Sequence, residues 1–151
     1  MVSEREKHLI PYAHTVVTRL FGKPDLVLEE SHIGYSALKP DLIFLFRREP
    51  YLVLVELEVD ADNKYCFWQS FCYTYYGLTL VVCDHVSSHS LAKYAEWGIG
   101  VAIRNKLLLV PRLVRTNIAM SRKIRDTILK LLSKRYNKKF ILDQASILDY
   151  M

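Results

Sequence analysis

Two glutamates interrupt a segment that otherwise has the apolar alternation of a β-strand. In residues 51–60, every second residue from Tyr51 to Val59 is apolar, whereas the intervening positions change from leucine at 52 and 54 to Glu56 and Glu58. Side chains of a strand alternate between its faces, so both carboxylates share one face with the two leucines. An unpaired ionised group buried there would cost several kcal/mol. The pattern predicts a cation opposite the glutamates, either a metal ion or an arginine such as Arg47, Arg48 or one from the C-terminal segment.

A third carboxylate, Asp41, begins the preceding apolar run. Asp41 follows Pro40 and precedes residues 42–46, which have the length and composition of a buried strand. Neighbouring strands lie about 4.8 Å apart, so Asp41 and Glu56 can converge. Convergent carboxylates suit Mg²⁺, which prefers oxygen ligands and promotes phosphodiester hydrolysis. We expect Asp41 and Glu56 to be metal ligands; the alternative is that Asp41 is an ordinary turn residue.

The order of these residues resembles that of the PD-(D/E)xK nuclease superfamily. Pro40-Asp41 is followed fifteen residues later by Glu56-Leu57-Glu58. Gln69 and Tyr73 then stand on an aromatic helix with the Q-x-x-x-Y spacing of RecB-type nucleases. The resemblance implies a restriction endonuclease-like αβββαβ core and a DNA endonuclease or exonuclease that uses Mg²⁺ or Mn²⁺. It also implies that the Leu57 carbonyl is a metal ligand and that Gln69 and Tyr73 position a water molecule or the DNA backbone.

The second glutamate of the motif departs from the usual pattern of this superfamily. Glu58 occupies the position that is usually lysine, as in some restriction enzymes in which the second glutamate is a general base or a metal ligand. Lys64, at the start of the following helix, is a candidate for the missing cation. Many members also place an acid before the core, for which Glu6, Glu29 and Glu30 are candidates. Asp60 and Asp62 are expected to be helix caps rather than ligands.

These residues require a particular order of helices and strands to hold them. Apolar periodicity and Gly or Pro punctuation predict a helix, three strands, a helix, a strand, a helix, a strand that is broken or turns back as a hairpin, and a last helix. Strands joined through helices indicate an α/β fold with a mixed central sheet flanked by helices. We expect residues 1–151 to form a single domain. The segments in this order are 9–20, 25–30, 40–46, 51–60, 61–76, 78–84, 87–98, 99–103 with 107–110, and a helix with Ile124, Ile128, Leu131 and Leu132 on its apolar face.

Positive charge is concentrated near the C-terminus. Residues 112–139 hold ten Lys or Arg residues against the single Asp126, whereas residues 1–111 hold eleven against thirteen acids. Such a segment suits a polyanion, most commonly nucleic acid, although a solvated helix face would look the same. We expect DNA contacts from the exposed side of this helical segment, by Arg115, Arg122, Lys123, Arg125, Lys130, Lys134 and Arg135.

Other features restrict where the protein acts and leave its function open between three classes. No apolar run approaches the roughly 20 residues that cross a bilayer, and the charged N-terminus is unlike a secretory signal, so a cytoplasmic location is expected. A DNA nuclease of repair, recombination or a mobile element is the first hypothesis. An inactive nucleic-acid-binding protein on the same scaffold is the second, and a protein that binds an acidic partner protein is the third. A homodimer is compatible with each.

Overall fold

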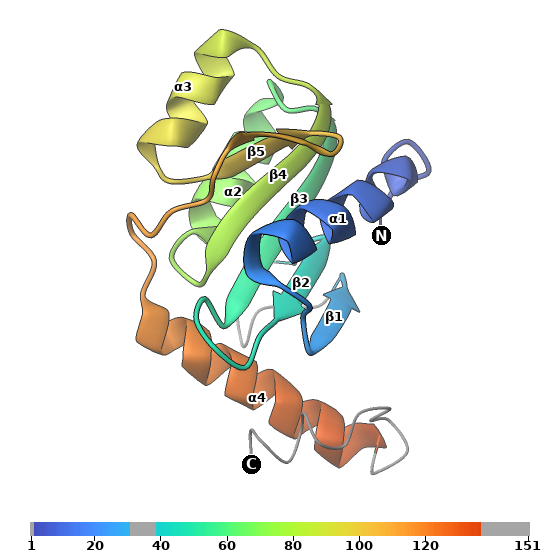
Figure 1. Ribbon diagram of the computed structural model, residues 1–151, viewed down its shortest axis with the longest axis vertical. Helices are drawn as coiled ribbons and strands as arrows, with labels where there is room; N and C mark the ends of the chain where they lie inside the picture. The colour runs from blue at the N-terminus through green and yellow to red at the C-terminus, as the bar shows by residue number, and fades with distance from the viewer. Residues whose placement is uncertain (1, 31–38, 137–151) are drawn as a thin grey trace.

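A six-stranded mixed sheet with the order β1-β2-β3-β4-β5-β6 forms the centre of the molecule (Figure 1). The computed structural model describes residues 2–30 and 39–136, without the side chains of 134–136. The strands are β1 (Leu26–Glu29), β2 (Leu42–Leu45), β3 (Leu52–Asp60), β4 (Leu78–His85), β5 (Gly100–Ile103) and β6 (Lys106–Leu109). The helices are the short 3-10 helix η1 (Lys7–Leu9), α1 (Ile10–Phe21), α2 (Lys64–Tyr73), α3 (Ser88–Glu96) and α4 (Ile118–Tyr136).

The predicted α/β class, with a mixed sheet flanked by helices, is confirmed. β3 pairs with β2 in the antiparallel sense and with β4 in the parallel sense, because α2 carries the chain back between β3 and β4. The β2–β3 register joins Leu42 to Val55. Its continuation by one residue sets Asp41 opposite Glu56.

The alternation of β3 divides the core between the two faces of the sheet. Val53, Val55 and Leu57 are buried on the face that α1 covers, as Figure 1 shows for the helix. Leu52 and Leu54 are buried on the opposite face, against residues of α2 and α4. Each such side chain contributes about 1.5–3 kcal/mol when it is removed from water. Since Glu56 and Glu58 continue the row of Leu52 and Leu54, they lie on the face that α2 and α4 cover.

Helix α4 turns most of its predicted apolar face to the sheet. Ile124 and Ile128 are buried and Leu132 is partly buried against this core as expected, but Leu129 is buried where Leu131 was expected, and Leu131 is 59% exposed. The predicted exposure of Arg125 is also wrong, since this residue is 4% exposed.

Arg125 is buried because its guanidinium donates hydrogen bonds to the backbone between β2 and β3. Its Nη1 donates hydrogen bonds to the carbonyl oxygens of Phe46 at 3.2 Å and Arg47 at 2.8 Å, and its Nη2 lies 2.6 Å from Asp126. Hydrogen bonds from charged groups to buried acceptors contribute about 1.5–3 kcal/mol. Arg125 therefore anchors α4 to the sheet rather than facing a ligand. Within the described ranges, neither α4 nor any other helix is long and apolar enough to span a membrane.

Candidate functional site

Asp41 and Glu56 meet where β2 begins and β3 passes its midpoint. Asp41 Oδ2 accepts a hydrogen bond of 2.7 Å from the backbone N–H of Leu57, which fixes the aspartate against β3. Glu56 is 7% exposed, whereas Asp41 and Glu58 are partly exposed. The structure thus brings together the two carboxyl groups that were predicted to converge, with one of them buried.

The two carboxyl groups cannot both ionise easily in this environment. Burial, followed by the neighbouring charge of Asp41, raises the pKa of Glu56 to about 10. Burial also raises the pKa of Asp41, against the opposing effects of the Leu57 N–H and the Glu56 carboxyl group. Near neutral pH, Glu56 therefore holds a proton. Its Oε1 is buried and has no hydrogen-bond partner in the described part of the chain.

The N-terminal segment contributes a further acid to this site. The charge of Glu6, at the start of η1, raises the pKa values of Asp41, Glu56 and Glu58. Among the three upstream candidates, Glu30 raises the pKa of Asp41, and Glu29 is exposed. Glu6 is the upstream acid whose charge acts on all three motif carboxyl groups. Its own carboxylate accepts a hydrogen bond from the Ser3 hydroxyl.

Glu58 lies at the edge of the site rather than in its centre. Residues two apart on one strand face are separated by about 7 Å, and Asp41, Glu56 and Glu58 do not bring three ligand atoms within 4.8 Å of one another. Burial, then the charge of Glu6, raises the pKa of Glu58, and the nearby Arg5 opposes this shift. Among the described residues, neither Glu56 nor Glu58 forms an ion pair with an arginine. Arg5 was not anticipated, because no local pattern connects it to β3.

Of the three site residues predicted on α2, only Tyr73 lies close to the carboxylates. Tyr73 is 1% exposed, and burial followed by the charges of Glu56 and Asp41 raises its pKa well above the usual value. Gln69 is exposed, because the buried face of α2 consists of Cys66, Phe67, Ser70 and Tyr73. Gln69 lies one helical turn before Tyr73 as predicted, but only Tyr73 is buried.

Lys64 does not approach the carboxylates either. Its side chain is exposed and lines a small hollow between α2 and α3, together with Lys93 and Ser90. The structure offers no support for Lys64 as a replacement for the motif lysine. The Leu57 side chain packs on the opposite face of the sheet, so only its backbone belongs to the site.

A second group of possible metal ligands, Asp60, Asp62 and His85, lies at the ends of β3 and β4. Their ligand atoms fall within 4.8 Å of one another, and all three residues are exposed. The expectation that the two aspartates cap α2 is wrong, since Asn63 accepts the capping hydrogen bond from the Tyr65 N–H. No sequence spacing connects His85 to the two aspartates, because the parallel pairing of Asp60 with His85 joins residues far apart in the chain.

The hydrogen bonds of Asp62 explain this second group without a ligand. Asp62 Oδ1 accepts from both the backbone N–H and the hydroxyl of Ser87 at 2.9 Å, and Oδ2 lies 3.3 Å from His85 Nε2. The Ser90 hydroxyl, followed by the Ser87 backbone N–H, lowers the pKa of Asp62 to about 2. Asp62 thus connects α3 to the end of β3, whereas the Oε1 atom of Glu56 accepts no such hydrogen bond among the described residues.

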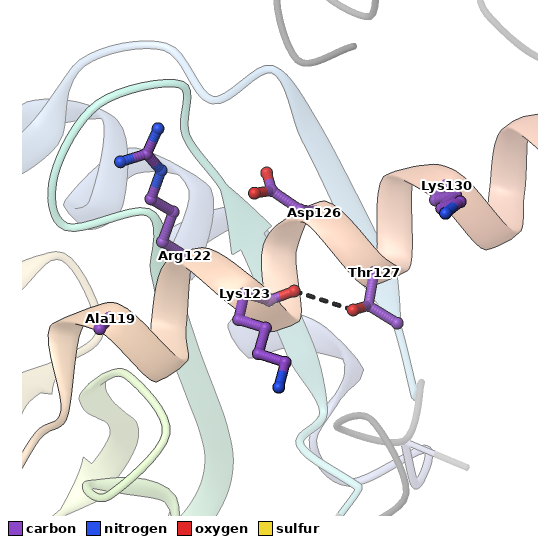
Figure 2. A pocket seen from close by; sticks show the side chains of 6 residues that line it. All are labelled: Ala119, Arg122, Lys123, Asp126, Thr127 and Lys130. Carbon is purple, nitrogen blue, oxygen red and sulfur yellow. Dashed lines mark hydrogen bonds between the residues drawn. The ribbon is translucent and has the colours of Figure 1, made fainter.

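The outer side of α4 presents several of the predicted DNA contacts. Arg122, Lys123 and Lys130 are exposed and line a shallow surface hollow with Asp126 (Figure 2). Arg122 and Lys123 leave the helix in different directions in this view. Arg115 is partly buried and lies over the ring of Phe71. The side chains of Lys134 and Arg135, and residues 137–139 of the basic segment, lie outside the described part of the chain.

Comparisons of the chain with protein-family models, curated proteins and solved structures found no match. The structure itself defines an α/β protein with a mixed sheet, an acid pair with one buried member on one sheet face and a basic helix packed on that same face.

Proposed function

We propose that this chain is a metal-dependent nuclease that hydrolyses phosphodiester bonds of DNA at the Asp41–Glu56 pair. The observation that carries the proposal is the buried Glu56 carboxyl group, which faces Asp41, has an Oε1 without a partner and is surrounded by acids. Leaving a buried acceptor unsatisfied costs about 1–3 kcal/mol, and adding negative charges around it costs more. A bound divalent cation would relieve both costs. The resemblance of the motif order to PD-(D/E)xK nucleases agrees with this interpretation.

The donor set fits a hard divalent cation such as Mg²⁺ or Mn²⁺. Asp41 and Glu56 supply carboxylate oxygens, the resemblance adds the Leu57 carbonyl, and Glu6 adds negative charge nearby. When bound, such an ion would act as a Lewis acid on the scissile phosphate. The hydrogen bond from the Leu57 N–H holds Asp41 in place for this role.

Glu58 is suited to accept a proton from the attacking water. It is partly exposed, so solvent reaches it, and burial, then the charge of Glu6, raises its pKa above the ordinary value. A raised pKa makes the carboxylate a stronger base toward water. Glu58 therefore compensates for the absent motif lysine by a different chemistry.

Metal-dependent cleavage is the direct test of this function. The purified chain should cut end-labelled single-stranded or duplex DNA with Mg²⁺ or Mn²⁺, and excess EDTA should reduce the rate to background. The labelled products distinguish cleavage at ends from internal cleavage. An absence of cutting of both DNA forms with both metals between pH 6 and 9 would contradict the proposal. DNA binding without any metal uptake would then favour an inactive binding protein on this scaffold.

The exposed cations of α4 should hold the DNA backbone. Helix α4 packs on Leu52 and Leu54, which precede Glu56 on the same strand face. Phosphate contacts release counterions, so each lost contact lowers the slope of log Kd against log salt by about 0.9 for duplex DNA. Combined Arg122→Ala, Lys123→Ala and Lys130→Ala changes should lower this slope by about 2–3, as measured by DNA retardation in EDTA.

A charge change outside α4 shows whether the salt dependence of DNA binding depends on the position of the lost charge. Lys106 is exposed on β6, and Lys106→Ala should leave the slope within about 0.5 of wild type. Equal effects of the triple variant and of any three surface lysines would remove α4 from the DNA-binding surface.

A further inference from the structure

The outer side of α2 exposes large aromatic side chains beside the acid site. Tyr65 is 78% exposed and Trp68 is 59% exposed. The inner side of the same helix carries the buried Cys66 and Tyr73 and faces the carboxylates. Burial raises the pKa of Cys66, and the charges of Glu56 and Glu58 act in the same direction. Helix α2 thus separates the acids from an exposed aromatic surface by about its own diameter of 10 Å.

Other rings hold Trp68 in place at this surface. Its ring meets Phe67 edge-on at 5.5 Å between centroids and Phe71 at 6.0 Å. Phe71 in turn packs edge-on against Trp97 at 4.9 Å. A supported ring loses little conformational entropy when a flat ligand stacks on it, as in pre-organised binding surfaces.

Cations stand at both ends of this aromatic cluster. Lys93 Nζ lies 4.5 Å from the centroid of the Phe67 ring, and the guanidinium carbon of Arg115 lies 4.1 Å from that of Phe71. Residues 63–83, which include all of α2, contain no Asp or Glu. The surface therefore combines stacking faces with positive charge, the two features that bind a single strand.

We infer that the outer side of α2 binds single-stranded nucleic acid, with bases stacked on Trp68 and Tyr65 and with phosphates near Lys93 and Arg115. This inference takes nucleic acid as the ligand from the proposed function and specifies its form. Duplex bases keep their faces inside the helix, whereas unpaired bases stack readily on exposed aromatic rings.

The test is binding of oligo(dT) in EDTA. Binding is measured by the quenching of tryptophan fluorescence and by the anisotropy of a labelled strand. Trp68→Leu keeps an apolar side chain but loses stacking, and it should weaken single-strand binding roughly tenfold. Trp68→Phe keeps a ring, so it should stay within about threefold of wild-type affinity, while the contribution of Trp68 to the fluorescence quenching is lost and only that of Trp97 remains. Circular dichroism confirms that each variant is folded.

Val110 supplies a control, because it is 54% exposed and lies outside both α2 and α4. Val110→Ala should leave oligo(dT) affinity unchanged. Unchanged oligo(dT) affinity in Trp68→Leu would overturn the inference. So would a wild-type dimer that dissociates in Trp68→Leu while oligo(dT) binding stays the same. The binding assay is carried out in EDTA and does not depend on cleavage. If oligo(dT) binding depends on Trp68 but the chain cuts no DNA with metal, the proposed activity alone is refuted. Metal-dependent cutting of duplex without Trp68-dependent binding would refute this inference alone.

Discussion

Glu56→Gln should abolish Mn²⁺ binding and reduce kcat/KM for DNA cleavage by about a thousandfold or more. A bound cation would displace the proton that Glu56 holds in the metal-free protein and pair with the resulting carboxylate, whereas the glutamine keeps the size of the side chain but cannot ionise. Lewis-acid assistance contributes several kcal/mol to such reactions, and each 1.36 kcal/mol corresponds to a factor of ten in rate. Asp41→Asn should have a similar effect, because Asp41 is the other carboxylate of the pair. Calorimetric titration with Mn²⁺ and initial cleavage rates measure the two losses separately.

The second carboxylate group provides the decisive control for this prediction. Asp60→Asn and His85→Ala alter the exposed group at the strand ends without touching the buried pair. We expect both variants to bind Mn²⁺ and cut DNA within about threefold of wild type. The opposite result, with Mn²⁺ binding lost in these variants and retained in Glu56→Gln, would assign the metal to Asp60, Asp62 and His85.

The free energy of unfolding of the metal-free protein should fall as the pH rises from about 5 toward 10. The folded chain keeps a proton on Glu56, whose pKa is raised to about 10 by burial and then by Asp41, whereas the unfolded chain releases this proton above its ordinary pKa of 4.5. The folded state therefore binds more protons across this window, and stability decreases with pH. The raised pKa of Asp41 acts in the same direction. One such group gives a slope of at most about 1.4 kcal/mol per pH unit.

Glu56→Gln should remove most of this pH dependence, because glutamine does not titrate. In urea unfolding at pH 5.5, 7 and 8.5 with EDTA present, the variant should gain stability relative to wild type as the pH increases. Glu96→Gln, at an exposed position on α3, should follow the wild-type curve. Parallel curves for Glu56→Gln and wild type would show that Glu56 is already ionised in the folded protein.

The strand alternation and the charge distribution were sufficient to predict much of the site. The period of two in residues 51–60 placed Glu56 and Glu58 on one face, and the structure has them there. The antiparallel connection of the two neighbouring strands then made the meeting of Asp41 and Glu56 predictable, because β2 and β3 are adjacent in the chain. The α/β class followed from the same local signals.

Only the tertiary structure decided which residues from distant parts of the chain lie near Asp41, Glu56 and Glu58. It selected Glu6 among three acids, added Arg5, and placed Asp60 beside His85 across a parallel pairing. It also buried Arg125, because the angle at which α4 crosses the sheet determines which of its faces is covered. Local periodicity determines which side chains share a face, but contacts between segments far apart in the chain depend on how complete elements pack, and no short pattern contains that information.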